Sequence, residues 1–324
     1  MNQIVFNSRY SIFSLLAVLG ILIFSCETDE TSFLTNPGSQ GLPGADRPPG
    51  WQLLLFNLND NLNDIFFING QAGWIVGEGQ TLLSTASADI GWSIAPVELP
   101  LENLNSVFFI NDQVGWVGGD LSANPLMGQV GYSGNGGGYP VQLETFGQPV
   151  NTILFQDMNM GWLAGNEGLL AKTINGGKNW EIIPAFTQEK IYDMQFTDHD
   201  SGWITAGNGG IFHSEDGLFW ELETTGTEAD LFAIHIHDQD NGWACGNLNT
   251  ILRRVNGPEG SSTWEQISID EAPANMTWKD IFFPDPSTGW VVGNFGLIYK
   301  STDGGLHWTK ENSGVLKNFG AIHM

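Results

Sequence analysis

Short runs in which apolar and polar residues alternate recur along the chain from residue 50 onward. Alternation with a period of two predicts β-strands, because successive side chains of a strand point to opposite faces of a sheet. Six runs share one pattern that ends in Asn or Asp: Asp64–Asn69, Ser106–Asn111, Thr152–Asp157, Asp193–Asp198, Ala233–Asp238 and Asp280–Asp285. The chain is therefore predicted to be an all-β protein built on a repeat.

A Gly-Trp pair follows each run, and its Gly lies four residues after the closing Asn or Asp. The Trp residues are 42, 46, 41, 40 and 47 residues apart: Trp74, Trp116, Trp162, Trp203, Trp243 and Trp290. We divide each unit into four strands: strand a is the alternating run, and strand b begins at the Trp. Strand c follows a Gly/Asn turn of the kind that joins hairpins. Strand d begins at a second aromatic residue: Trp92, Tyr139, Trp180, Trp220, Trp264 or Trp308.

Four-stranded units of about forty residues predict a β-propeller, since each sheet must bury both faces against its neighbours. The six units are complete. Residues 50–56 resemble a strand d without its partners, and residues 316–322 resemble a strand a without its partners. The two extra strands favour a seven-bladed ring whose seventh blade is partial and reduced to two strands. A six-bladed ring with additions at its ends is the alternative.

The link between strands c and d carries a motif in several units. In the sixth unit, residues 301–308 match the Asp-box pattern S-x-D-x-G-x-x-W in full, and the second and fifth units keep only part of it. The matching residues are Ser301, Asp303, Gly305 and Trp308 in the sixth unit, Thr173, Asn175, Gly177 and Trp180 in the third, and Ser214, Asp216 and Trp220 in the fourth, where one residue is deleted.

The repeated D-I-x-F-x-D, the G-W-x-x-G-N-x-G sequence and the Asp box resemble the photosystem II assembly and stability factor family of seven-bladed propellers. The resemblance covers residues 50–324 and implies a non-catalytic assembly chaperone that uses basic patches to contact its partner. It also implies that the Asp boxes close the peripheral hairpins, a structural role away from the ligand-binding face. Basic residues are few and scattered in this chain, and only Arg253 and Arg254 are adjacent.

The first 25 residues have the features of an export signal, with Arg9 before an apolar stretch of about a dozen residues. Ile23-Phe24-Ser25-Cys26 resembles a bacterial lipobox, which implies that Cys26 is lipidated; an ordinary signal peptide is the alternative. Residues 26–49, rich in Pro, Gly, Ser and Thr, are predicted to be a flexible tether. The expected location is the bacterial outer membrane or the cell surface, with residues 50–324 as the propeller.

The composition excludes some functions. The formal net charge of −25 argues against nucleic-acid binding, because an acidic surface repels phosphate. A sialidase needs three arginines from different blades, and only Arg47, Arg253 and Arg254 follow the signal, one of them in the tether. A glycoside hydrolase with two carboxylates acting on extracellular polysaccharide remains the alternative function.

Three further features could indicate a metal site or a reactive group, but we interpret each of them as structural. His235 and His237 have a spacing used for metals, but we expect them to pack between blades or face the central channel. The Asn and Asp residues before each Gly-Trp pair are expected to cap turns and not to bind calcium. Cys245 replaces an apolar residue of the other units, which predicts a buried, inert thiol.

The sequence thus predicts no catalytic residue, no cofactor and no metal. We expect a monomeric binding scaffold whose partner, a protein or a glycan, meets the variable loops between strands d and a. These loops are Glu98–Asn103, Thr224–Asp230 and Ser268–Met276, and an insertion between strands b and c at Asp120–Met127 should lie on the same rim.

Overall fold

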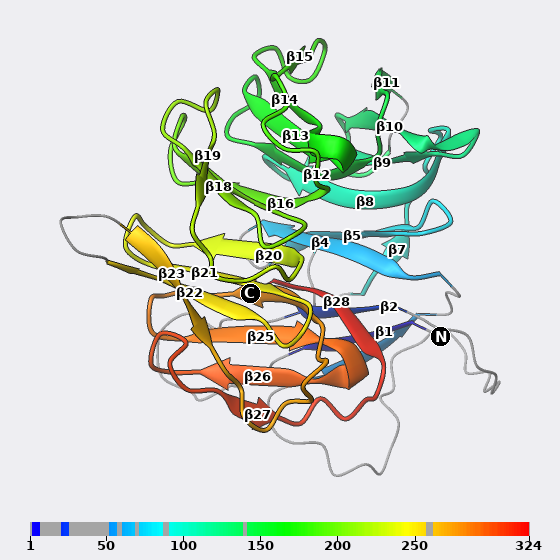
Figure 1. The fold of residues 1–324 in the computed structure, drawn as a ribbon. Coiled ribbons are helices and arrows are strands. Elements are labelled where there is room, and N and C mark those ends of the chain that lie inside the picture. Colours follow the sequence, from blue (N-terminus) through cyan, green and yellow to red (C-terminus); the bar gives the residue numbers. More distant parts are fainter. Residues whose placement is uncertain are drawn as a thin grey trace.

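The computed structural model describes residues 2–6, 21–25, 52–56, 60–68, 71–86, 91–138, 141–256 and 262–323. Its strands are arranged as blades around a common axis (Figure 1). None of the described residues forms a helix of the length and apolarity that a membrane crossing requires. The predicted lipidation site, Cys26, and the tether lie outside the described residues.

Six blades each contain four antiparallel strands that follow one another in the chain, with strand a at one edge of the sheet and strand d at the other. Their strands are β4 (Leu62–Ile68), β5 (Ala72–Gly77), β6 (Leu82–Thr85) and β7 (Ser93–Ile94) in blade 1; β8 (Leu101–Phe109), β9 (Gly115–Leu121), β10 (Asn124–Ser133) and β11 (Val141–Phe146) in blade 2; β12 (Val150–Phe155), β13 (Gly161–Gly165), β14 (Leu170–Thr173) and β15 (Glu181–Ile182) in blade 3; β16 (Ile191–Phe196), β17 (Gly202–Ala206), β18 (Ile211–Ser214) and β19 (Glu221–Glu223) in blade 4; β20 (Leu231–Ile236), β21 (Gly242–Gly246), β22 (Ile251–Asn256) and β23 (Ser262–Ile267) in blade 5; and β24 (Trp278–Phe282), β25 (Gly289–Gly293), β26 (Ile298–Ser301) and β27 (Thr309–Glu311) in blade 6.

Two single-turn 3₁₀ segments, η1 (Asn166–Gly168) and η3 (Asn294–Gly296), lie between strands b and c of blades 3 and 6. The residue before the final Gly of each has a positive φ, 53° at Glu167 and 60° at Phe295. These are the Gly/Asn turns expected from the sequence, and the final residue has a positive φ as well, 68° at Gly168 and 67° at Gly296, which favours glycine there.

The favoured prediction of a seven-bladed ring with a two-stranded seventh blade is wrong. The structure has six four-stranded blades of the repeat type, which is the alternative. The two extra strands, β3 (Gln52–Phe56) and β28 (Asn318–His323), do not form a two-stranded remnant. They are the outer members of a sheet with the order β28-β2-β1-β3, where β1 (Asn2–Phe6) and β2 (Ile21–Ser25) lie within the predicted export signal. The repeat pattern could not reveal this pairing because β1 and β2 do not share it.

Neighbouring blades are joined by the strand-b Trp residues. Trp74 and Trp116 stack on the Phe that ends strand a of the next blade, and Trp243 stacks on Phe283, directly after strand a of blade 6; the ring centroids are 3.6, 3.5 and 3.7 Å apart. The same indole N–H groups donate hydrogen bonds of 2.9, 3.1 and 2.9 Å to glycine carbonyls in the next blade's c–d loop. Because these rings are at most 2% exposed, each junction between blades is a separate apolar core.

The propeller has two ends. We call the end where strands a and c begin the entry face, and the opposite end, which carries the Asp boxes, the box face. Strand β28 completes the inner layer between β24 and β4. Asp280 in β24 accepts a hydrogen bond of 2.7 Å from the backbone N–H of Ile322 in β28.

Candidate functional site: the mouth of the entry face

One register position distinguishes the two halves of the entry face. It is the residue immediately before the repeated strand-a motif, and it lies beside the central axis. Blades 1 to 3 have asparagine there and blades 4 to 6 have larger side chains; the residues are Asn63, Asn105, Asn151, Tyr192, Phe232 and Lys279. The mouth of the propeller therefore has an amide half and an aromatic, cationic half.

The three asparagines tie each blade to the next. The Nδ2 atoms of Asn63, Asn105 and Asn151 donate hydrogen bonds of 3.0, 2.9 and 2.8 Å to backbone carbonyls at the start of the following strand a. Asn105 Nδ2 also donates to Asp120 Oδ1 at 2.9 Å, and Asn151 Nδ2 donates to Asn166 Oδ1 at 3.0 Å. With both amide hydrogens engaged, the orientation of Asn105 and Asn151 is fixed. Their Oδ1 atoms accept no hydrogen bond from the described residues.

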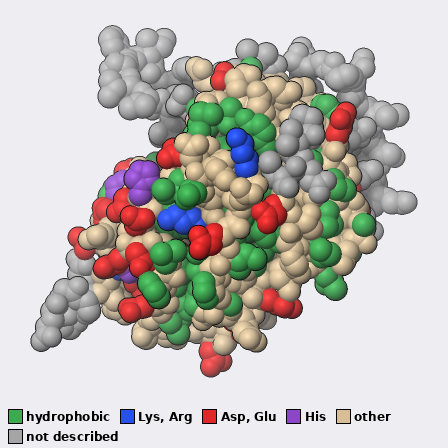
Figure 2. Space-filling model, turned by 90° about the horizontal axis from the view of Figure 1, so that it is seen from above, with side chains coloured by type: hydrophobic (Ala, Val, Ile, Leu, Met, Phe, Trp, Pro, Cys, Tyr) green, Lys and Arg blue, Asp and Glu red, His purple; other side chains and the backbone are tan. Residues whose placement is uncertain are grey.

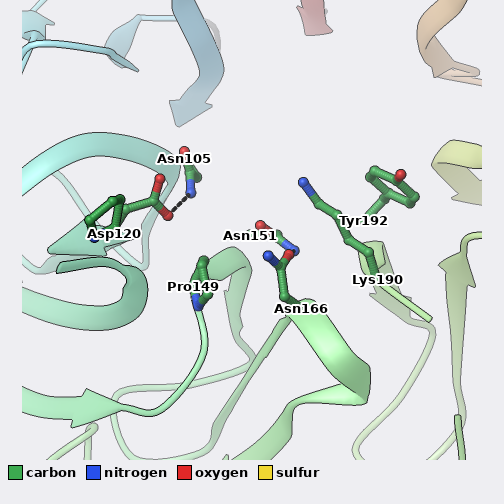
Figure 3. A pocket seen from close by; sticks show the side chains of 8 residues that line it. Asn105, Asp120, Pro149, Asn151, Asn166, Lys190 and Tyr192 are labelled. Carbon is green, nitrogen blue, oxygen red and sulfur yellow. Dashed lines mark hydrogen bonds between the residues drawn. The ribbon is translucent and has the colours of Figure 1, made fainter. Parts of the chain in front are cut away.

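A cavity of about 330 Å³ opens beside these asparagines (Figure 3). Its walls come from blades 2, 3 and 4 and combine amides, one carboxylate, one ammonium and one phenol. The lining residues are Asn105, Asp120, Pro125, Pro149, Asn151, Asn166, Lys190 and Tyr192. We call this cavity the entry pocket.

The insertion predicted at Asp120–Met127 forms one wall of the entry pocket through Asp120 and Pro125. It is a hairpin extension of β9 and β10, in which Leu121 pairs with Asn124, and not an irregular loop. Its tip is exposed, and Leu126 keeps 72% of its surface accessible. The insertion therefore lies on the rim where the sequence places it, with more regular structure than expected.

Two lysines stand over aromatic rings at the other side of the mouth. Lys190 Nζ lies 4.9 Å from the centroid of the Tyr192 ring, and Lys279 Nζ lies 4.7 Å from that of Phe232. The two rings meet edge to face with centroids 4.8 Å apart. Loss of hydration among the surrounding atoms lowers the pKa of both ammonium groups, and for Lys190 attraction to Asp120 opposes the effect.

Tyr192 is held by the same surroundings. Its hydroxyl lies 3.5 Å from Asp230 Oδ2. Burial, together with the negative charge of Asp230, raises the pKa of Tyr192 to about 12. The phenol is therefore neutral at physiological pH and acts as a hydrogen-bonding and stacking group.

Three carboxylates lie deeper along the axis, at the first position of the repeated strand-a motif. In Asp64, Asp193 and Asp280, one oxygen accepts the N–H of the next residue and the other accepts an N–H from the following inner strand. Burial raises the pKa of Asp64 to about 6 and that of Asp193 to about 7, while backbone hydrogen bonds oppose the rise. Each carboxylate thus bridges its own strand a and the following inner strand, so these groups join neighbouring sheets.

The predicted Asp-box residues are brought together on the box face. In blade 6, Ser301 Oγ accepts the N–H of Gly305 at 2.8 Å and donates to Asp303 Oδ1 at 2.9 Å. Thr173 and Asn175 form the same bonds in blade 3, and Ser214 and Asp216 do so in blade 4 with Gly217 as the donor. The three aromatic residues that close the boxes lie in the outer layer: Trp180, Trp220 and Trp308.

Other candidates from the sequence lie away from the entry pocket. His235 packs edge to face on Phe282, at 4.8 Å between centroids, and burial lowers its pKa to about 4. Cys245 is fully buried, which raises the pKa of its thiol. Asp285 Oδ1 accepts the N–H groups two and three residues ahead, and Asn111, Asp157, Asp198 and Asp238 do the same; Asn69 lies outside the described residues. No three His, Cys, Asp or Glu side chains gather as a metal site within the described ranges.

Analysis of the sequence missed Lys190, Tyr192 and the asparagine row. A signal was present, because these asparagines, Tyr192 and Lys279 occupy one position of the repeat. The repeat is defined by residues that are the same in every unit. This position varies, since it is asparagine in blades 1 to 3 and a larger residue in blades 4 to 6, and it is therefore not part of the repeat pattern. Figure 2 shows the acidic side chains scattered over one side of the molecule, where Lys and Arg are sparse.

Comparisons with known proteins bear on the fold and the class of function. No family model matches the chain. The sequence is 24% identical over 313 residues to the photosystem II assembly lipoprotein Ycf48 of Trichormus variabilis, which covers 95% of this chain and 86% of that protein.

Solved structures agree with the sequence match. A structure described as YCF48 bound to D1 peptide has a TM-score of 0.66 at 21% identity, covering 83% of this chain and 86% of that one. YCF48 from Cyanidioschyzon merolae has a TM-score of 0.62 at 18% identity, covering 81% and 88%. The resemblance inferred from the repeat is thereby confirmed.

Enzymes share the fold as well. An ancestral GH74 enzyme has a TM-score of 0.57 at 14% identity, and the match covers 81% of this chain but only 38% of the enzyme. At this level of identity the match shows the fold alone.

Proposed function

Since the chain is homologous to the Ycf48 photosystem II assembly factors, we propose that it is a non-catalytic assembly scaffold that binds a protein partner at its entry face. The observation that carries this proposal is the entry pocket, whose amides are held by the fold and whose Lys190 forms no ion pair among the described residues. Fixed polar groups around a cavity are typical of recognition sites on rigid scaffolds. One relative, named as bound to D1 peptide, supports a peptide segment as the element recognised.

The proposal includes a location in the cell envelope. The sequence around Cys26 supports lipidation at that residue and attachment to the bacterial outer membrane. A Cys26→Ala variant is expected to move from the membrane fraction to the soluble fraction of cells. A variant that stays in the membrane fraction would contradict lipid anchoring.

Site-specific crosslinking tests the binding face. A photoreactive residue at Ala123, on the exposed tip of the β9–β10 hairpin, is expected to give adducts with a protein partner in cells. The same residue at Thr302, which is exposed on the box face, is the matched control and should give none. Adducts from Thr302 and none from Ala123 would place binding at the other end and refute the proposal.

A further inference from the structure

The chemistry of the entry pocket narrows the kind of segment that it can hold. The pocket contains both unused acceptors and unused donors. The acceptors are the Oδ1 atoms of Asn105 and Asn151, and the donors are the ammonium of Lys190 and the Nδ2 atom of Asn166. A ligand that satisfies this set must itself offer N–H groups, a carbonyl oxygen and an anionic group.

The two acceptors suit a peptide main chain. Asn105 and Asn151 occupy the same position in consecutive blades, so their Oδ1 atoms repeat around the mouth in one orientation. Each amide is held by two hydrogen bonds between 2.8 and 3.0 Å, and therefore little conformational freedom is lost when a ligand binds. An extended segment could donate its backbone N–H groups to this row without any requirement on its side chains.

The lysine supplies the specificity. Lys190 lies at the pocket edge and is exposed, yet it forms no ion pair within 4.0 Å among the described residues. Its ammonium rests on the Tyr192 ring, and Figure 3 shows its side chain reaching toward Asn151 and Asn105. Loss of hydration is the main cause that lowers its pKa, attraction to Asp120 opposes it, and repulsion from Lys279 adds to the lowering. A ligand carboxylate bound here would form a charge-assisted hydrogen bond with the ammonium of Lys190. Its negative charge would offset the cost of keeping this ammonium charged near Lys279 with little hydration.

The rest of the protein limits how acidic the ligand can be. The formal net charge of −25 repels a strongly acidic chain, and Asp120 forms the opposite wall of the same pocket. One carboxylate placed at Lys190 is compatible with this field, whereas a run of acidic residues is not.

On these grounds, and resting on the function proposed above, we propose that the entry pocket binds an extended peptide segment carrying a single carboxylate. Lys190 anchors the carboxylate, and Asn105 and Asn151 accept main-chain N–H groups. The carboxylate comes either from an Asp or Glu side chain or from the carboxyl terminus of the segment.

Positional-scanning libraries of synthetic octapeptides, bound to the full-length protein, test this proposal. One library has a single Asp or Glu and an amidated terminus, a second has neutral side chains and a free terminus, and a third has Asn or Gln and an amidated terminus. We expect at least one of the first two libraries to bind tenfold more tightly than the third, and the preference between them identifies the source of the carboxylate.

Two variants test whether Lys190 is responsible for the preference for peptides with a carboxylate. Lys190→Gln is expected to lower the affinity for the preferred carboxylate library about tenfold and to leave the amide library unchanged. Lys300→Gln is the matched control, because its ammonium also lies over an aromatic ring, at 4.6 Å from the centroid of the Trp290 ring, but in strand c away from the entry pocket. It should have no effect on either library.

Three outcomes would overturn the inference: equal affinity for the carboxylate and amide libraries, unchanged affinity after Lys190→Gln, or no binding of any library. None of these outcomes decides the scaffold function, which the crosslinking at Ala123 tests separately. Crosslinks from Ala123 together with equal library affinities would mean that a protein binds this face without a carboxylate anchor.

Discussion

The junction between blades 4 and 5 differs from the junction between blades 5 and 6, although both join the same kind of repeat. At the second junction, Trp243 stacks on Phe283 and donates to the Gly304 carbonyl of the Asp box at 2.9 Å. At the first, the box is lost, and the strand-b indole of Trp203 has no hydrogen-bond partner among the described residues. One repeat position is thus stabilised in two chemically different ways.

An ion pair takes the place of the missing box. Arg254 occupies the strand-c position that Ser301 holds in blade 6, and it is only 5% exposed. Its NH1 atom lies 2.6 Å from Glu223 Oε2 in blade 4, and its guanidinium lies 5.1 Å from the Trp203 ring. Trp264 also donates to Glu223 at 2.6 Å. Blade 5 therefore has a partly buried charge network at the position where blade 6 has a backbone-capping motif.

The largest effect at a fixed pH is expected from breaking this ion pair. Arg254→Met leaves the partly buried Glu223 without its cation and removes a buried guanidinium, which should lower the free energy of unfolding by about 3 kcal/mol. Chemical denaturation measures the change. Arg253→Met removes the same charge from the neighbouring position, whose side chain forms none of the described ion pairs, and should cost less than about 1 kcal/mol. Similar losses in both variants would show that the Arg254–Glu223 pair is not special.

The two junctions should also differ in how their contribution to stability depends on pH, because strand a of blade 4 carries a titrating carboxyl at the first position of the repeated motif and strand a of blade 5 does not. Asp193 joins blade 4 to Ile234 of blade 5, whereas the residue in its place in blade 5 is Ala233. The pKa of Asp193 is raised from 3.8 to about 7 in the folded protein. The folded state therefore holds this proton more tightly, and stability is lost as the pH rises from about 4 to about 7, by on the order of 4 kcal/mol.

Asp193→Asn is expected to flatten this part of the stability profile, because the amide does not titrate. Thermal or chemical unfolding from pH 4 to pH 8 measures the slope, which does not depend on the constant cost of replacing the carboxylate. Asp240→Asn, an exposed change in the a–b turn of blade 5, is the control and should keep the wild-type slope. A slope unaltered by Asp193→Asn would contradict the assigned pKa.

The smallest effect concerns the indole hydrogen bonds. Trp243→Phe removes the donor to Gly304 and part of a ring, while Trp203→Phe removes the same part of a ring and no hydrogen bond. Trp243→Phe should therefore cost about 1 kcal/mol more than Trp203→Phe. Denaturation curves of the two variants, recorded side by side, give the difference. Equal costs would mean that the bond to the box adds nothing to the stacking.

These junctions show what the sequence can and cannot predict. The spacing of Gly-Trp pairs predicts the six blades, because each repeat unit buries the indole of its strand-b Trp. The role of Arg254 could not be predicted, since its partner Glu223 lies 31 residues earlier in another blade. The same reason applies to Lys190 and Asn105, which meet only after three blades are placed around an axis. The prediction of a two-stranded seventh blade was wrong because β3 and β28 form a sheet with β1 and β2, whose sequences do not contain the repeat.

The direction of the indole bonds has a mechanical consequence. Each of Trp74, Trp116 and Trp243 bonds to the following sheet and not to its own, so blades 1, 2 and 5 each depend on the next blade to satisfy a buried donor. Separating the sheets at one of these junctions would leave an indole N–H on one side and a glycine carbonyl on the other without a partner. Opening the ring should thus be costly at these three junctions, which favours unfolding as a single cooperative step.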